Sequence, residues 1–164
     1  MLTSENKQKI DAARQVLVGK VPNPIGQVQE ITNALIYKFM DDMDEKAVSM
    51  GGKRRYFSGD YEKYSWRTIM DPKVGAHKRI DLYTEALSRM SENPNIPELF
   101  RNIFRNAYLP FNDSRTLTLF LNEINYIGKL MNIKHDNKLK LKFLDFDLNS
   151  YIIIYFYILM EIFI

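Results

Sequence analysis

The sequence contains no cysteine among its 164 residues. Disulfide bonds, thiolate metal sites and a cysteine nucleophile are therefore excluded. Histidine is also scarce, because only His77 and His135 occur, and neither belongs to a metal-binding motif. We therefore predict no metal site and no cofactor bound by this chain.

Several catalytic motifs are missing as well. No glycine-x-serine-x-glycine elbow surrounds any serine. The pair Gly51-Gly52 is too short for a phosphate-binding loop, and it does not follow a predicted strand. The sequence thus offers no catalytic constellation, and a helical body of this size is typical of a binding or assembly module.

The N-terminal residues, MLTSENKQKIDAARQ, lack the apolar run of a secretory signal, so we expect a cytoplasmic location. The length fits one domain plus a tail, and 46% hydrophobic and 13% aromatic residues are enough for a core. The formal net charge of +3 is mildly basic, which permits a nucleic-acid partner without requiring one.

Helical periodicity dominates the chain up to residue 127, and no segment there alternates with the period of a strand. Prolines and glycines interrupt the pattern at residues 19–26 and 93–97. The sequence predicts an all-α fold, a bundle of about five helices joined by long ordered loops. The predicted helices cover residues 6–18, 27–43, 76–90, 97–107 and 114–124, with Pro97 as a first helical residue and Asp113 or Ser114 as the last cap.

Residues 51–66, GGKRRYFSGDYEKYSW, combine a basic triplet with a group of aromatic residues. We call this segment the basic loop. Such cations can meet phosphates through charge and bidentate guanidinium contacts. The alternative is a solvated loop whose aromatic residues pin it to the helices. A second basic cluster at residues 73–79 either extends this surface or is an exposed helix start. The candidate DNA-binding residues are Lys53, Arg54, Arg55, Lys63, Arg67, Lys78 and Arg79.

Four acidic residues, Asp41, Asp42, Asp44 and Glu45, precede this loop. They lack the glycine-centred, alternating spacing of a calcium loop. We interpret them as the solvated end of a helix.

The amino-acid composition of the chain changes at about residue 128. From Gly128 onward there is no Ala, Val, Arg, Pro, Thr, Gln or Trp, and residues with A/T-rich codons dominate. The last apolar run, residues 151–164, has 14 residues, fewer than the roughly 18 that argue for a membrane span. We therefore expect an aggregation-prone tail rather than a membrane anchor. The chain divides into a helical domain, residues 1–127, and a tail, residues 128–164.

Five stretches within residues 2–126 are similar, in the same order, to one protein family. They read LTSENKQKIDAARQVLVGKVPNP, QEITNALIYKFMDDMDEKAV, YEKYSW, RIDLYTEALSRMSENPNIPELFRNIFRNAYLPF and TLTLFLNEIN. On these residues the chain resembles the N-terminal helical domain of the modification (methyltransferase) subunit of type I restriction-modification systems. The resemblance implies that a Rossmann-like domain follows in the full-length family, where it binds S-adenosylmethionine and methylates adenine at N6.

The resemblance also implies partners. In the family, two modification subunits assemble with one specificity subunit, a restriction subunit joins the full complex, and the helical domains help to close around DNA. The family's cofactor loop, DPxCGxGxF, and its catalytic motif, NPP[FY], do not occur in this sequence. We therefore expect a non-catalytic part of an adenine methyltransferase subunit, one that contributes assembly and DNA clamping. The resemblance stops near Tyr126, so residues from about 127 onward are interpreted as an out-of-frame ending of a truncated subunit.

Two other interpretations stay open. The first is a stand-alone helical module that binds protein or nucleic acid. The second is attachment to a membrane through the apolar tail.

Overall fold

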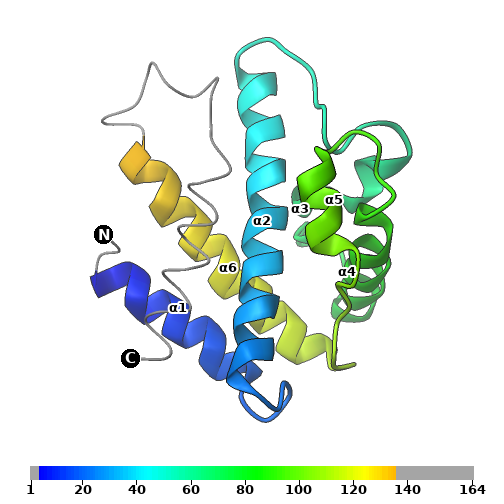
Figure 1. The fold of residues 1–164 in the computed structure, drawn as a ribbon. Coiled ribbons are helices and arrows are strands. Elements are labelled where there is room, and N and C mark those ends of the chain that lie inside the picture. Colours follow the sequence, from blue (N-terminus) through cyan, green and yellow to red (C-terminus); the bar gives the residue numbers. More distant parts are fainter. Residues whose placement is uncertain (1–3, 136–164) are drawn as a thin grey trace.

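The computed structural model describes residues 4–135, and every regular element in this range is a helix (Figure 1). The predicted all-α fold is therefore confirmed for the described residues. The elements are α1 (Ser4–Leu17), α2 (Pro24–Ser49), the 3-10 helix η1 (Gly59–Tyr64), α3 (Trp66–Ile69), α4 (Ala76–Met90), α5 (Glu98–Phe104) and α6 (Ser114–His135).

Helix α2 begins at a well-defined cap. Asn23 has an extended backbone, and its side-chain oxygen accepts a hydrogen bond from the N–H of Gly26 at 2.6 Å. Pro24 follows at the first helical position, where the backbone needs no N–H donor. The chain thus turns sharply from α1 into α2.

The far end of α2 differs from the prediction. The apolar pattern predicts an end at Met43, but the helix continues to Ser49. The predicted end is wrong because the acidic residues beyond the apolar stripe still belong to the buried face of the helix. Asp44 lies on this face, although its charge suggests a solvated turn.

Helix α2 is the central element of the fold (Figure 1). Helices α1 and α6 pack together on one side of it, whereas α3, α4 and α5 lie on the other. Helix α6 also crosses to α4, so the two sides are tied together at one end. The loop after α2 and the segment around α3 therefore share one side of the molecule.

The core of this side is built around the ring of Tyr37 in α2. Its hydroxyl donates a hydrogen bond to the backbone carbonyl of Tyr64. Four aromatic rings with centroids 5.4–6.3 Å away surround it, those of Phe57, Trp66, Tyr83 and Phe104. Edge-to-face contacts of this kind stabilise beyond the apolar area they bury. They join α2 to the basic loop, α3, α4 and α5.

Of the remaining boundaries, only the end of α6 lies far from the predicted one, at His135 instead of residue 124. Helix α4 has the predicted bounds, and Pro97 is the cap of α5 rather than its first residue. Asp113 caps α6, because its side chain accepts from the N–H groups of Arg115 at 3.0 Å and Thr116 at 3.1 Å.

Helix α6 runs to His135 and so passes through the domain boundary expected at residue 127. Residues 136–164, which hold most of the predicted tail, lie outside the described residues. Within residues 4–135 no helix combines the length and the apolar content needed to cross a membrane.

Candidate nucleic-acid interface

The acidic end of α2 is not solvated. Asp41 is 3% exposed and Asp44 is 1% exposed, which corrects the expectation of a solvated helix end for these two residues. Only Glu45 of the four is largely exposed, and Asp42 pairs with Lys38 one turn earlier. Buried carboxylates require partners, and here the partners come from the basic loop.

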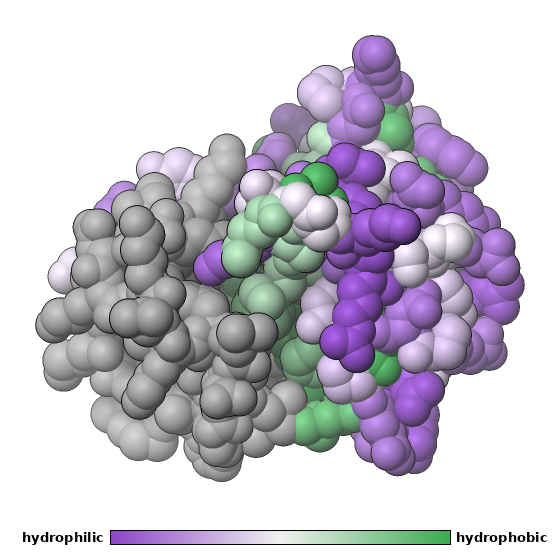
Figure 2. All heavy atoms as spheres, turned by 90° about the horizontal axis from the view of Figure 1, so that it is seen from above, coloured by the Kyte–Doolittle hydropathy of each residue, from purple (hydrophilic) through white to green (hydrophobic). Residues whose placement is uncertain are grey.

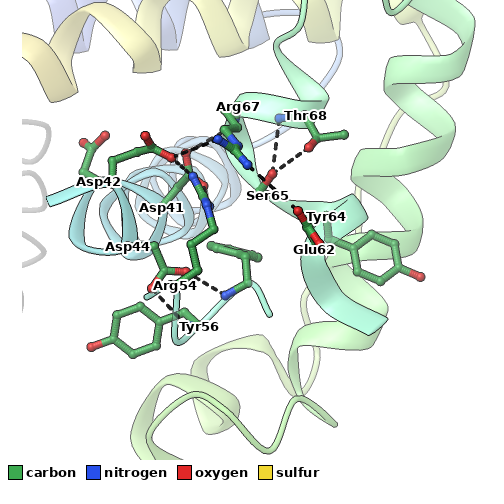
Figure 3. Close-up of polar contacts among 12 residues, drawn as sticks. Asp41, Asp42, Asp44, Arg54, Tyr56, Glu62, Tyr64, Ser65, Arg67 and Thr68 are labelled. Atoms are coloured by element: carbon green, nitrogen blue, oxygen red, sulfur yellow. Dashed lines mark hydrogen bonds and ion pairs between the residues drawn. The ribbon is translucent and has the colours of Figure 1, made fainter. Parts of the chain in front are cut away.

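Asp44 holds the backbone of this loop (Figure 3). Its Oδ1 accepts from the N–H groups of Arg55 at 2.8 Å and Tyr56 at 3.0 Å, and its Oδ2 accepts from the N–H of Phe57 at 2.8 Å. Three charge-assisted bonds from consecutive residues fix the loop against the helix. The buried ring of Phe57 anchors the same turn in the core.

Arg54, the middle residue of the basic triplet, points inward to the acidic residues of α2 (Figure 3). Its guanidinium donates to Asp41 Oδ1 at 3.1 Å and also pairs with Glu45, and its side chain is only 11% exposed. Burial raises the pKa of Asp41, and the hydrogen bond and charge of Arg54 oppose that rise. Arg54 therefore neutralises the acidic cluster and presents no free guanidinium to a ligand.

Lys53 and Arg55 flank this buried arginine and are both exposed. The backbone N–H of Arg55 is bound to Asp44, but its side chain forms no ion pair with any described residue, and neither does that of Lys53. The sequence KRR thus divides into one internal cation and two displayed ones.

Lys63 and Arg67 lie on the same side and are paired with surface carboxylates. Lys63 Nζ is 3.1 Å from Glu85 Oε1 and sits over the ring of Tyr64, 4.7 Å from its centroid. Hydrogen bonds to Tyr64 and Glu85 raise the pKa of Lys63. Arg67 lies 3.6 Å from Glu45 and about 4.0 Å from Glu62. Exposed pairs of this kind are weak.

The backbone around Arg67 is held firmly. The N–H of Arg67 donates to Asp41 Oδ2 at 3.2 Å, so the same carboxylate holds both Arg54 and the first turn of α3. Ser65 caps this turn, because its hydroxyl accepts from the N–H of Thr68 at 3.3 Å (Figure 3).

Arg79 is buried and binds the backbone of the segment that precedes its helix. Its Nε donates to the carbonyl of Ile69 at 2.9 Å, and one terminal nitrogen donates to the carbonyls of Asp71 at 3.3 Å and Val74 at 2.9 Å. The other terminal nitrogen donates to the Thr118 hydroxyl of α6 at 3.2 Å. Arg79 is a structural brace, whereas its neighbour Lys78 is exposed.

This role makes Arg79 sensitive to an otherwise conservative change. We expect Arg79→Lys to lower the free energy of unfolding by about 2 kcal/mol, because one ammonium group cannot replace the fork that reaches three carbonyls and a hydroxyl. Urea unfolding of the two proteins measures the difference. The matched control is Lys78→Arg, which should leave the unfolding midpoint unchanged; equal midpoints for all three proteins would contradict the brace.

The aromatic residues of the loop mostly serve the core. Phe57, Tyr64 and Trp66 are buried, so they pin the loop to the helices instead of presenting rings for stacking. Tyr64 also donates its hydroxyl to Glu85 Oε1 at 2.5 Å. Tyr56 and Tyr61 pack partly against the core.

An open hollow of about 740 Å³ lies beside the loop, between η1 and α4. The sequence does not predict it, because it depends on how η1 meets the side of α4. Its lining includes the cations Lys63 and Arg89 and the acids Asp60 and Glu62. These charges cancel, so the hollow has little net attraction for an anion.

The described residues contain no group of three or more histidine or acidic side chains arranged to hold a metal ion. The chain matches no protein-family model, and comparisons with curated proteins and with solved structures found no match. The interpretation of the site therefore depends on its own geometry and on the sequence resemblance.

Proposed function

We propose that this chain is the N-terminal helical part of a type I modification subunit and that it contacts duplex DNA through its basic loop. The family in this proposal comes from the five similar stretches, which lie within residues 2–126. By that resemblance, its partners are a specificity subunit, a second modification subunit and a restriction subunit. Methylation and S-adenosylmethionine binding belong to the full-length family, and no described residue is assigned to either.

The main support for the proposal is that the side chains of Lys53 and Arg55 are exposed. Both are exposed cations without an ion pair among the described residues, and they flank an arginine that is already neutralised. A cation without a carboxylate partner can contact a phosphate without first losing an ion pair. The backbone bond to Asp44 holds Arg55 on a fixed turn, which lowers the conformational cost of binding.

A salt titration tests the proposal. We expect the double variant Lys53→Ala, Arg55→Ala to bind a duplex more weakly than the unchanged chain, with a slope of log K against log salt that is smaller by about 1.8. Each lost phosphate contact releases about 0.9 fewer counterions, which is the reason for this value. Fluorescence anisotropy of a labelled duplex at rising salt measures the slope.

The matched control removes two cations from α1, on the other side of α2 (Figure 1). Lys7→Ala, Arg14→Ala should keep the slope of the unchanged chain. The proposal is overturned if the unchanged chain fails to bind at about 50 mM salt, or if both double variants bind equally well.

One observation favours a protein partner at the same end of the molecule. Val48 and Met50 are exposed at the end of α2, just before the basic loop, and Met50 is 77% exposed. Figure 2 looks onto this end and shows a band of apolar surface beside a region of hydrophilic side chains. An assembly module that binds the specificity subunit here is the second candidate function. Met50→Gln, which adds no charge beside the loop, should weaken such an association, measured by co-purification with a specificity subunit, while leaving DNA affinity intact.

A further inference from the structure

A second group of displayed cations lies where α4 and α6 begin. Lys73, Lys78 and Arg115 are exposed, and none forms an ion pair with a described residue. Lys73 precedes α4, Lys78 is in its first turn, and Arg115 is in the first turn of α6. We call these three residues the α4–α6 patch.

Arg79 holds the three members of this patch together. Lys73 lies between Asp71 and Val74, whose carbonyls Arg79 binds, and Lys78 is the residue before Arg79. Arg115 lies one turn before Thr118, whose hydroxyl accepts from the same guanidinium. One buried side chain thus ties all three elements that carry the exposed cations.

The acidic residues near the patch do not neutralise it. The Asp71 carboxylate accepts from the N–H of Lys73 at 2.8 Å, and Asp113 pairs with Lys20 at 2.7 Å while it caps α6. Hydrogen bonds from Lys20 and Thr116 lower the pKa of Asp113. Asp81 is exposed one turn after Lys78 and forms no ion pair with a described residue. Three cations thus face two carboxylates without an ion pair among the described residues, those of Asp71 and Asp81, so the patch keeps a net positive charge.

A continuous set of contacts joins the patch to the basic loop. Asp41 of α2 accepts both from Arg54 in the loop and from the backbone of Arg67 in α3. Two residues further on, the carbonyl of Ile69 accepts from Arg79 in α4. The two groups of cations are therefore linked through buried and partly buried hydrogen bonds, with the half-exposed Arg67 between them.

We infer that the α4–α6 patch is a second phosphate-contact surface, and that one duplex meets it together with Lys53 and Arg55 of the loop. The inference rests on the proposed function and extends it from a local contact to a footprint along one side of the molecule. A polyanion with evenly spaced charges fits two fixed cationic groups, whereas a single small anion would occupy only one of them.

Four full-length proteins test the inference in the same salt titration. They are the unchanged chain, the loop variant Lys53→Ala, Arg55→Ala, the patch variant Lys73→Ala, Lys78→Ala, Arg115→Ala, and the α1 control Lys7→Ala, Arg14→Ala. We expect the patch variant to lower the salt slope by about 2.7 and to weaken binding at about 0.1 M salt at least tenfold, since it loses three contacts. All three substitutions remove exposed side chains, and circular dichroism and urea midpoints verify that the fold is unchanged.

Lysine acetylation gives an independent reading on the unchanged chain. Bound duplex should slow the acetylation of Lys53, Lys73 and Lys78 but not that of Lys7, as measured by mass spectrometry.

The outcomes separate the two proposals. If the loop variant loses affinity while the patch variant keeps its slope, and bound duplex does not slow the acetylation of Lys73 and Lys78 in the unchanged chain, the loop contact stands and the second surface is overturned. If the unchanged chain does not bind at all, the proposed function and the second surface fall together. Losses in both variants, with an unaffected control, support the extended footprint.

Discussion

Replacing Asp44 by alanine is expected to lower the free energy of unfolding by about 4 kcal/mol, the largest effect of any single change considered. The substitution removes a carboxylate that accepts three backbone N–H groups from residues 55–57. Hydrogen bonds to charged groups stabilise by about 1.5–3 kcal/mol each, and their sum is less than additive. The buried N–H of Phe57 would also be left without an acceptor, which adds to the cost.

Two further variants make this expectation specific. Asp44→Asn keeps an oxygen that can accept from Arg55 and Tyr56 but turns an amide donor toward Phe57, so about half of the loss should remain. Asp60→Ala removes an exposed carboxylate from the same region and should change stability by less than about 0.5 kcal/mol. Urea unfolding measures all three, and a stability of Asp44→Ala equal to that of Asp60→Ala would show that the loop is not held from α2.

Destabilisation should be accompanied by a loss of ligand contact. Without Asp44, the backbone of residues 55–57 loses its three bonds to α2, and Arg55 loses its fixed position. In conditions where Asp44→Ala is still folded, its affinity for duplex should therefore fall even though no cation has been removed.

The second large effect comes from Glu30, a carboxylic acid buried in the second turn of α2. Its residue is 6% exposed, and its Oε2 has no hydrogen-bond partner among the described residues. The buried hydroxyl of Tyr83 in α4 is likewise without a partner in the described part of the chain, and its pKa is raised by burial and by the charge of Glu30. Burial raises the pKa of Glu30 from 4.5 to about 7.

The direction of the resulting pH dependence follows from proton binding. Because the folded pKa lies above the unfolded one, the folded state binds this proton more tightly. The contribution of Glu30 to stability is therefore fully present below about pH 4.5 and is lost as the pH rises through about 7. A difference of this size corresponds to about 3 kcal/mol.

Glu30→Gln isolates this contribution. The variant removes the titration, so at pH 8 it should be more stable than the unchanged chain by up to about 3 kcal/mol, whereas at pH 4.5 the two should be nearly equal. Urea unfolding between pH 4 and pH 8 gives the difference in free energy of unfolding between the two proteins at each pH. The contributions of the other titrating groups cancel in this difference. A difference that does not change with pH would show that Glu30 does not titrate in this range.

The comparison of sequence and structure is clearest at the ends of the helices. Helix α4 has the predicted bounds because its apolar spacing, its preceding glycine and the following proline are all local signals. Helix α2 extends six residues beyond its predicted end, because the burial of Asp41 and Asp44 depends on a loop that returns to them from 11 or more residues away. A prediction from hydrophobic periodicity treats charged residues as solvated, and it contains no information about a contact with a loop further along the chain.

The basic residues show the same division. The sequence indicates seven cations as candidates, but it cannot distinguish Arg54 and Arg79, which bind within the fold, from Lys53, Arg55 and Lys78, which face outward. It also treats Lys73 and Arg115 as unrelated, since the link between them runs from Arg79 to Thr118, 39 residues apart. Whether a charged side chain is paired within the fold or exposed depends on its neighbours in space, which the sequence does not give.

By itself, then, the sequence determined the features that arise from neighbours along the chain: the helical class, most helix limits, the absence of cysteine chemistry and the presence of two basic clusters. Only the tertiary structure decided which cations of each cluster are exposed. The physical reason is that burying a carboxylate is costly without donors, so Asp41 and Asp44 recruit the loop and one of its arginines. The cations left over, Lys53 and Arg55, are the ones available to a partner.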